Sequence, residues 1–304
     1  MKVMVALPTD LVDRPEEFVT GPAVMEMALH AERVGVTGVF VTDHPAPDDR
    51  WLAGGGHHSL EPTVALSFAA AATTTLRLIT NVYVAAYRPP LLAAKSLASL
   101  DALSGGRLIV GVAAGYLRPE FRALGIDFDR RGDLLNEAID TMRSAWTGRS
   151  VVAQGHGWST RGTTILPTPV SGAALPIWGG GNSLAAMRRV VERCDGWMPF
   201  ATPPGMAGAV RTAEISTVEQ LATRIELLDS LCAEAGRSQR PTISFNVLSS
   251  IDDADAFAAE LDGVARLGVD WVSVMLPPSV ATRAEWLECV SELANLAATI
   301  HGSR

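Results

Sequence analysis

Cysteine is scarce in this sequence, and its spacing excludes two common roles. The 304 residues include only three cysteines, Cys194, Cys232 and Cys289, which lie far apart and form no CxxC or Cys/His pattern. An odd number of widely spaced cysteines argues against a disulfide framework, and the missing pattern excludes the usual structural zinc motifs. We therefore expect three buried thiols in a protein of a reducing compartment.

Positive charge is also in short supply. The chain carries 25 Lys and Arg against 33 Asp and Glu, which gives a formal net charge of -8. Binding to the phosphate backbone of nucleic acids depends on clustered Lys and Arg, and the sequence contains no such cluster. We expect no nucleic-acid partner.

Long hydrophobic runs are missing as well. The N-terminal sequence reaches Pro8, Asp10 and Asp13 before an apolar region of signal-peptide length develops. The longest apolar region, TVALSFAAAA at 63–72, is about half of the roughly 20 residues that a membrane span needs. These absences predict a cytoplasmic protein without a membrane partner.

Short apolar runs alternate with helical segments along the chain. Runs rich in β-branched and aromatic residues predict eight strands, at 2–7, 38–42, 76–84, 107–113, 175–180, 195–200, 242–248 and 269–276. Apolar residues at helical spacing predict helices between them, among others at 23–35, 131–146, 217–236 and 255–268. Strands that alternate with helices form parallel sheets covered on both faces. Eight such units favour one α/β domain over residues 1–304, a closed (β/α)8 TIM barrel, with an open doubly wound sheet as the alternative.

Two long segments interrupt the regular pattern. The segment 147–171 contains short Thr- and Val-containing runs separated by glycines, which predicts an inserted hairpin. Such an insertion either shapes a substrate entrance or is a surface loop without a catalytic role. The segment from Asp43 to Leu60 follows the second strand and is a candidate lid.

Three glycines, Gly179, Gly180 and Gly181, join the fifth strand to a helix and are followed by Asn182 and Ser183. Glycine removes the Cβ that would keep a ligand away from the backbone, and the free N–H groups of a helix N-terminus attract anions. The two polar side chains can cap the helix or contact an oxygen. The run departs from the dinucleotide-binding fingerprint and lacks the P-loop lysine, so we predict a phosphate cradle, with an ordinary tight turn as the alternative.

The second strand ends in Asp43 and His44. The loops after the strands of a (β/α)8 barrel form its active site, and an imidazole exchanges protons near neutral pH. His44 is therefore the strongest catalytic candidate, with Asp43 beside it, and the alternative is a histidine that only satisfies loop backbone groups. His57 and His58 could join them in a metal site, but apart from Asp195 no suitable ligand ends strands five to seven, so we expect no metal.

Small residues end the fourth strand, from Gly111 to Gly115, and Tyr116, Arg118 and Glu120 follow at once. Small side chains at a strand end let a flat ring approach the backbone, which makes Gly115 and Tyr116 candidates for cofactor binding. The alternative is that small residues are needed to fill the interior of the barrel.

Four motifs resemble, in their order and spacing, the bacterial-luciferase-like flavin-dependent superfamily and in particular its branch that uses the deazaflavin coenzyme F-420. They are TDHP, LSGGRLIVGVAAGYLRPEFRALG, RGDLLNEAIDTMRSAW and LPIWGGGNSLAAMRRVVERCDGWMP. The resemblance covers about residues 1–200 well and the remainder in layout only. The sequence departs from the family at Ala113, Ala114 and Tyr116, where glycine and tryptophan are commoner. The resemblance implies a (β/α)8 barrel whose cofactor ring lies across the C-terminal face.

The resemblance also implies roles for individual residues. Asp43 and His44 would lie beside the deazaflavin ring, with His44 handling a proton or orienting the substrate. Thr80, Asn81 and Val82 fall where the family bends its third strand with a non-proline cis peptide that supports the ring. We therefore expect a cis peptide bond near Asn81.

The activity implied by the resemblance is hydride transfer between C5 of coenzyme F-420 and a small organic substrate, with the protein supplying orientation and a proton. The cofactor phosphate would bind at Gly179 to Ser183. The first alternative is an FMN-dependent monooxygenase that activates oxygen. A non-enzymatic flavin-binding protein and a metal-dependent barrel hydrolase are further alternatives. Barrels of this family commonly pair, so a homodimer is expected.

Overall fold

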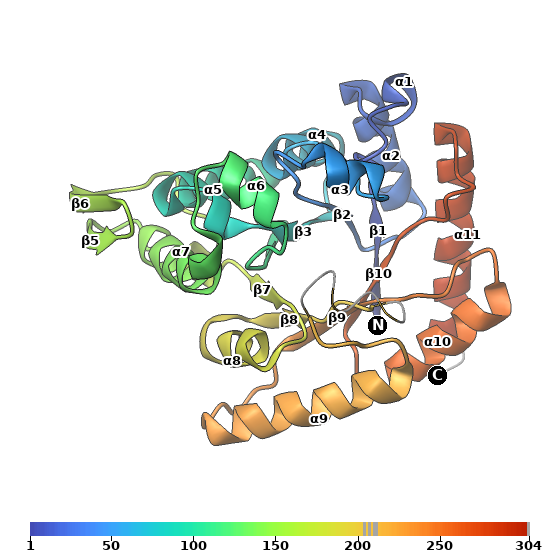
Figure 1. The fold of residues 1–304 in the computed structure, drawn as a ribbon. Coiled ribbons are helices and arrows are strands. Elements are labelled where there is room, and N and C mark those ends of the chain that lie inside the picture. The colour runs from blue at the N-terminus through green and yellow to red at the C-terminus, as the bar shows by residue number, and fades with distance from the viewer. Residues whose placement is uncertain (203–204, 206–207, 209–211, 303–304) are drawn as a thin grey trace.

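Eight parallel strands close into a barrel, in the spatial order β1-β10-β9-β8-β7-β4-β3-β2 (Figure 1). The computed structural model describes residues 1–202, 205, 208 and 212–302. The strands are β1 (Lys2–Ala6), β2 (Gly38–Val41), β3 (Arg77–Tyr83), β4 (Leu108–Val112), β7 (Ile177–Gly180), β8 (Gly196–Met198), β9 (Thr242–Asn246) and β10 (Trp271–Val274). Because β1 pairs with both β2 and β10, the sheet has no open edge. The predicted TIM barrel is confirmed, and the open doubly wound sheet is excluded.

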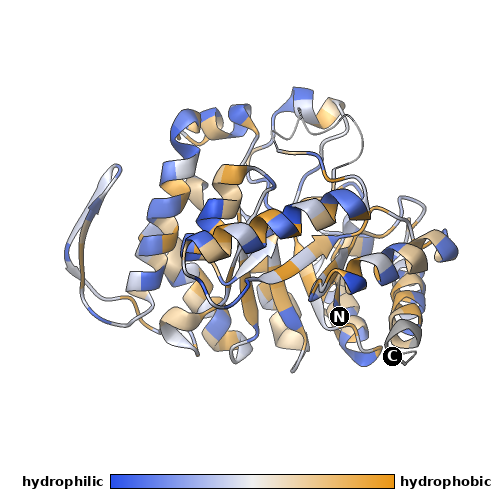
Figure 2. Ribbon diagram, turned by 90° about the horizontal axis from the view of Figure 1, so that it is seen from below, coloured by the Kyte–Doolittle hydropathy of each residue, from blue (hydrophilic) through white to orange (hydrophobic). Residues whose placement is uncertain are grey.

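Alternate residues of the strands build two apolar layers. One set of side chains fills the inside of the barrel and consists of Met4, Ala6, Phe40, Ile79, Ile109, Trp178, Met198 and Trp271. The other set points outward and packs against the helices, as Val3 and Val5 of β1 do. Figure 2 shows the apolar strands at the centre and polar helix faces outside. Since both faces of the sheet are buried, the strands read as nearly continuous apolar runs in the sequence.

Helices surround the barrel. They are α1 (Pro15–Phe18), α2 (Gly21–Arg33), α3 (Asp49–Ala53), α4 (Pro62–Ala72), α5 (Pro90–Ser104), α6 (Arg118–Ala123), α7 (Arg131–Ala145), α8 (Leu184–Arg193), α9 (Val218–Glu234), α10 (Ala254–Arg266) and α11 (Arg283–Gly302), with short 3-10 turns η1 (Ala85–Tyr87), η2 (Phe128–Arg130) and η3 (Gly172–Ala174). Local sequence sets several ends: the Thr20 hydroxyl accepts from the Ala23 N–H at the start of α2, and α5 ends at Gly105 with φ +69°. The predicted helices at 23–35, 131–146, 217–236 and 255–268 correspond to α2, α7, α9 and α10. Among the described residues, no helix is both long and apolar enough to cross a membrane.

The predicted insertion at 147–171 is an antiparallel hairpin between α7 and β7. Its strands β5 (Val151–Gly155) and β6 (Trp158–Thr163) pair only with each other and project away from the barrel (Figure 1). The Glu137 carboxylate of α7 accepts hydrogen bonds from the Trp158 indole (2.6 Å) and from the His156 backbone N–H (3.0 Å), which ties the hairpin to the helix.

The three cysteines are buried and none of them forms a disulfide, as the sequence predicts. Burial raises the pKa of the Cys194 thiol to about 12 and that of Cys289 to about 11. These thiols are therefore packing residues in their protonated form.

Candidate active site

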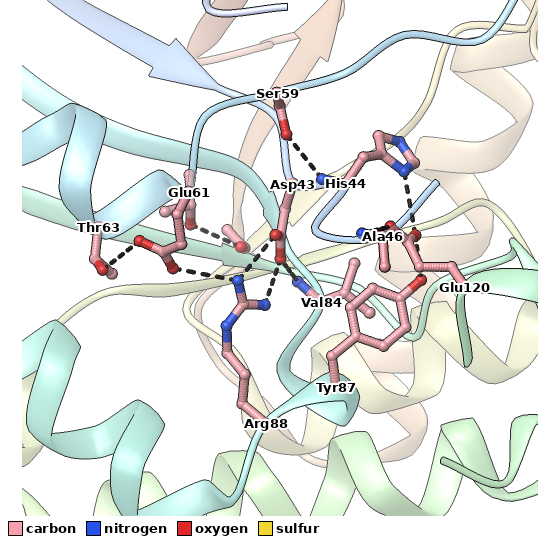
Figure 3. Close-up of polar contacts among 12 residues, drawn as sticks. Asp43, His44, Ala46, Ser59, Glu61, Thr63, Val84, Tyr87, Arg88 and Glu120 are labelled. Carbon is pink, nitrogen blue, oxygen red and sulfur yellow. Dashed lines mark hydrogen bonds and ion pairs between the residues drawn. The ribbon is translucent and has the colours of Figure 1, made fainter. Parts of the chain in front are cut away.

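The carboxyl end of β2 places Asp43 and His44 at one mouth of the barrel, where Figure 3 shows both side chains. Asp43 is almost completely buried, and its carboxylate is fully used by its neighbours. Its Oδ2 accepts from the Val84 backbone N–H (2.8 Å) and from Arg88 (2.6 Å), and its Oδ1 accepts from the same guanidinium (2.9 Å). Asp43 therefore joins the end of β2 to the segment that follows β3.

His44 faces a buried carboxylate from another part of the chain. Its Nδ1 lies 3.3 Å from Oε2 of Glu120, which belongs to α6 and is fully enclosed (Figure 3). The same Oε2 accepts from the Tyr87 hydroxyl at 2.8 Å, and Oε1 accepts from the Ala46 backbone N–H at 2.9 Å. The His44 backbone N–H donates to the Ser59 hydroxyl (2.8 Å), which closes the segment 44–59 on itself.

The hydrogen bonds to Glu120 fix its charge. Burial by itself would raise the pKa of this carboxyl, but the hydrogen bonds from His44, Ala46 and Tyr87 outweigh burial and hold the pKa below its ordinary value. Burial, and next the charge of Glu120, raises the pKa of the Tyr87 hydroxyl, so this group stays protonated and donates. An ionised carboxylate only accepts hydrogen bonds, so His44 Nδ1 must carry the hydrogen between them. The atom of His44 that is left to exchange a proton with a bound molecule is therefore Nε2.

Aromatic rings surround the imidazole of His44. Trp51 of α3 lies 4.5 Å away, His57 lies 4.9 Å away and Tyr116 lies 6.0 Å away, measured between ring centroids. Burial, followed by the charge of Glu120, raises the pKa of Tyr116 to about 12. The strand ends thus place the His44 imidazole, backed by Glu120, among the flat rings of Trp51, His57 and Tyr116.

A cavity of about 310 Å³ opens beside this cluster, between the ends of β4 and β7. Its lining includes five of the residues predicted to bind cofactor, namely Gly115, Tyr116, Gly180, Gly181 and Ser183. The Ser183 hydroxyl caps α8 by accepting from the Ala186 N–H (3.2 Å), so the first turn of that helix begins at the cavity. A helix N-terminus is suited to bind an anion, and the glycines before it let the anion come close to the backbone N–H groups.

Glycine is required at two of these positions. Gly181 has φ +108°, a backbone conformation that other residues rarely adopt. Gly115 has φ +80°, and a Cβ there would come within 2.8 Å of Val84 and 2.9 Å of Phe121. At Gly180, in contrast, a Cβ would make only ordinary contacts of 3.4 Å, with Ala113 and Val82 among others. The chain itself therefore tolerates a side chain at Gly180.

Two arginines also line the cavity, and sequence reasoning missed both. Arg131 begins α7, and Arg189 lies in α8 four residues after Ala185, which is itself a lining residue. Arg189 donates to the Asn136 side chain and the Gly132 carbonyl, which fixes its guanidinium near the cavity. Arg189 lies four residues after Ala185 and three after Ala186, so all three share the face of α8 that lines the cavity.

Two predicted cofactor residues direct their side chains elsewhere. The Asn182 side chain is fully buried and bonds the backbone of Phe200 through both its oxygen and its nitrogen, and Ala213 through its nitrogen, each at 2.7 Å. The Thr80 hydroxyl is also buried and donates to the Gly111 carbonyl (2.8 Å). Both residues shape the strand ends without facing the cavity.

The third strand has the irregularity that the resemblance implied. The peptide bond between Asn81 and Val82 is cis, and the pairing of β3 with β4 shifts between Thr80 and Tyr83. Val82 packs on the apolar interior of the barrel. The predicted cis peptide near Asn81 is confirmed.

The groups considered for a metal site do not come together as one set, although the rings of His44 and His57 are in contact. Among the residues that the structure describes, no three His, Cys, Asp or Glu side chains are placed to hold a metal ion. Asp195 precedes β8, so it lies at the amino-terminal end of the barrel, where it accepts from the Ile177 N–H and from Arg143. That end also has a depression of about 630 Å³, but its arginines bond to carbonyls and carboxylates of the chain.

Comparisons with known proteins agree with this geometry. The model of the luciferase-like monooxygenase family matches residues 1–288. An uncharacterized protein of Mycobacterium tuberculosis is 30% identical over 219 residues, which cover 72% of this chain and 71% of that protein. The FMNH(2)-dependent dimethylsulfone monooxygenase of Pseudomonas putida is 33% identical, over 57% of this chain and 46% of its own length. The F420-dependent glucose-6-phosphate dehydrogenase of Rhodococcus hoagii is 31% identical, over 56% of this chain and 50% of its own length.

Solved structures show the same fold. The monooxygenase RslO1 from Streptomyces bottropensis superposes with a TM-score of 0.77 at 20% identity, covering 99% of this chain and all of that one. An F420-dependent secondary alcohol dehydrogenase gives a TM-score of 0.72 at 18% identity, covering 97% of this chain and 99% of that one. The barrel, the polar strand ends and the family match lead to one conclusion: this chain is a member of the luciferase-like monooxygenase family, which includes both F420- and FMN-dependent enzymes.

Proposed function

We propose that this protein is an oxidoreductase that transfers hydride between the deazaflavin coenzyme F-420 and a small organic substrate. The observation that carries the proposal is the His44–Glu120 pair beside a cavity suited to an anion. Hydride transfer to a carbonyl, or from an alcohol, requires a proton to move as well, and a histidine backed by a carboxylate is suited to that task. The similarity to an F420-dependent dehydrogenase supports the choice of cofactor.

The cavity residues fit the phosphate of such a cofactor. Gly180 and Gly181 expose backbone at the entrance to α8, and Ser183 starts the helix whose N-terminus faces the cavity. Arg131 and Arg189 add positive charge to the same lining, in which the carboxylate of Asp129 is paired with Arg118. These residues would hold the phosphate, while Val82 and the small residues that follow β4, Ala113 to Gly115, would support the ring. When bound, the deazaflavin supplies hydride chemistry at C5.

His44 and Asp43 take different parts in this proposal. His44 gives or takes the proton through Nε2, because Nδ1 is committed to Glu120. Both carboxylate oxygens of Asp43 accept from Arg88, and Oδ2 also accepts from the Val84 N–H. This arrangement favours a role in holding the segment after β3 in place over a role in proton transfer. The rings of Trp51 and His57 would keep water away from the proton.

The second candidate is an FMN-dependent monooxygenase, which the 33% identity to a dimethylsulfone monooxygenase favours. Both cofactors carry a ring, a ribityl chain and a phosphate, so the same cavity suits either. Titration of the cofactor-free protein with coenzyme F-420 and, separately, with FMN, followed by ring fluorescence, distinguishes them. We expect tighter binding of the deazaflavin; a preference for FMN would instead indicate oxygen chemistry.

Replacing Gly180 by valine is expected to weaken cofactor binding by about 10-fold to 100-fold, which corresponds to the loss of one hydrogen bond to the charged phosphate. The chain leaves room for the new Cβ, whereas the two methyl groups would enter the cavity. The dissociation constant from the same fluorescence titration is the measurement. Leu184→Ala is the control. Leu184 is the first residue of α8, directly after Ser183, but it is exposed and does not line the cavity. Equal affinities for Gly180→Val and the unchanged protein would place the phosphate elsewhere.

We also propose that two copies of the chain pair through α4 and α5. Between Pro62 and Ala72, α4 contains no charged residue, and its outer face exposes Val64 (56%) and Phe68 (44%). The neighbouring α5 exposes Leu92 (60%). A surface helix without charge is typical of an interface, and soluble oligomers are mostly symmetric pairs.

Light scattering coupled to size-exclusion chromatography is expected to give the mass of two chains, each of 32.2 kDa. Val64→Glu should place a charge in the interface and yield single chains, because a buried unpaired charge is strongly unfavourable. Val152→Glu, at a more exposed valine of the hairpin (75%), should leave the pair intact. A single-chain mass for the unchanged protein would exclude this interface.

A further inference from the structure

Tyr87 contacts the His44–Glu120 pair through its hydroxyl, and the proposed reaction does not use it. It belongs to η1, after β3, whereas Glu120 comes from α6 and His44 from the end of β2. Its side chain is buried, its ring packs edge-on against Phe121 at 4.6 Å, and its hydroxyl points at Oε2 of Glu120 (Figure 3). A buried tyrosine hydroxyl with one carboxylate partner has a defined direction, because it can only donate to an ionised carboxylate.

Tyr87 and His44 share a single oxygen of Glu120. The Tyr87 hydroxyl lies 2.8 Å from Oε2, the ordinary length of a strong O–H to carboxylate bond, while His44 Nδ1 lies at 3.3 Å, a long and weak one. The other oxygen, Oε1, is held by the Ala46 backbone N–H and cannot turn toward His44 without losing that bond. Two donors on one oxygen divide its negative charge between them, so the shorter bond to Tyr87 weakens the one to His44.

We propose that Tyr87 is a positioning residue that sets the proton affinity of His44 by competing with it for Oε2 of Glu120. The proposal rests on the proposed function in one respect, namely that His44 exchanges a proton during the reaction. With Tyr87 in place, Glu120 holds His44 in the Nδ1–H form through a longer bond than the one it makes to Tyr87. A histidine bound more tightly to a buried carboxylate would keep its proton.

The other titratable groups that face His44 leave Glu120 as its main charged partner. Tyr116 stays protonated because its pKa is raised, and His57 stacks edge-on at 4.9 Å with its Nδ1 bonded to the His58 carbonyl. The adjacent Asp43 is neutralised by its two bonds to Arg88. A change at Tyr87 should therefore reach His44 through Glu120.

Tyr87→Phe tests the proposal, because it removes the hydroxyl and keeps the ring. The His44 ring proton is followed by NMR against pH in the cofactor-free protein. We expect the midpoint of its titration to rise by about half a pH unit or more, since Oε2 is left to His44 alone. In the active enzyme, the limb of the pH-rate profile that reports this histidine should move in the same direction. A midpoint that stays or falls would overturn the proposal.

Two further variants separate this effect from a general loss of structure. Tyr83→Phe removes another buried hydroxyl nearby, from a ring that packs under Arg88, and should leave the midpoint in place. An equal rise in both variants would overturn a role specific to Tyr87. Glu120→Gln should lower the midpoint by about one pH unit or more, because an opposite charge is lost; no change there would show that Glu120 is not the group through which Tyr87 acts.

These titrations need no cofactor, so their result is independent of whether coenzyme F-420 binds. Failure of the cofactor titration with a rise in the Tyr87→Phe midpoint would overturn the proposed function and leave the coupling intact. Tight cofactor binding with an unmoved midpoint in Tyr87→Phe would overturn the coupling and leave the proposed function intact.

Discussion

Replacing His44 by glutamine is expected to slow the chemical step by about 100-fold to 10,000-fold, the usual contribution of a general acid or base. Glutamine retains a polar side chain of similar reach but cannot give or take a proton near neutral pH. The geometry gives the reason: the ring is held by Glu120 on one side and stacked against Trp51 on the other, so Nε2 is the atom presented to a bound molecule.

The measurement is single-turnover reduction or reoxidation of the bound deazaflavin, followed by its absorbance, with an alcohol or ketone that the unchanged protein turns over. The cofactor dissociation constant should stay the same, because His44 does not line the cavity between the ends of β4 and β7. His58→Gln is the matched control, since His58 lies in the same segment but is exposed. A rate for His44→Gln within about threefold of the unchanged protein would remove His44 from the proton transfer, which otherwise contributes at least about 100-fold.

Much of the fold could be predicted from the sequence because it follows from local patterns. The strands of a barrel covered on both faces are short apolar runs, and turns rich in glycine separate them from helices, so all eight strands and the hairpin at 147–171 were placed correctly. Capping residues such as Ser183 mark helix starts in the sequence itself. The cis peptide at Asn81 was expected only from the family resemblance.

The site was predictable only in part, because its contacts join distant segments. Glu120 is 76 residues from His44, and the sequence showed it only as a carboxylate following a strand. Asn182 illustrates the opposite case, since its position after three glycines suggested an oxygen contact. In the fold its amide instead holds the backbone of Phe200 and Ala213, a role that depends on where another loop passes.

Removing the carboxylate of Asp43 should have the largest effect on stability. Asp43→Ala is expected to lower the free energy of unfolding by about 3 to 5 kcal/mol, the usual loss when one partner of a buried ion pair is removed. The Asp43 side chain is 1% exposed and that of Arg88 is 15% exposed, so the guanidinium would be left largely buried with only Glu61, which is 38% exposed, as its partner. The buried Val84 N–H would also lose its acceptor.

Urea unfolding followed by tryptophan fluorescence measures this loss as a lower midpoint with an unchanged slope. Glu61→Gln is the control on the same guanidinium, and because its carboxylate is exposed we expect it to cost about 1 kcal/mol or less. A third variant, Asp43→Asn, decides between two roles of Asp43, namely proton transfer and support of the loop. If Asp43→Asn unfolds at the same urea concentration as the unchanged protein yet turns over as slowly as His44→Gln, Asp43 takes part in the chemistry as the sequence predicts. If stability falls and the remaining folded enzyme keeps its rate, the carboxylate holds the loop in place, and the chemistry depends on His44 and Glu120.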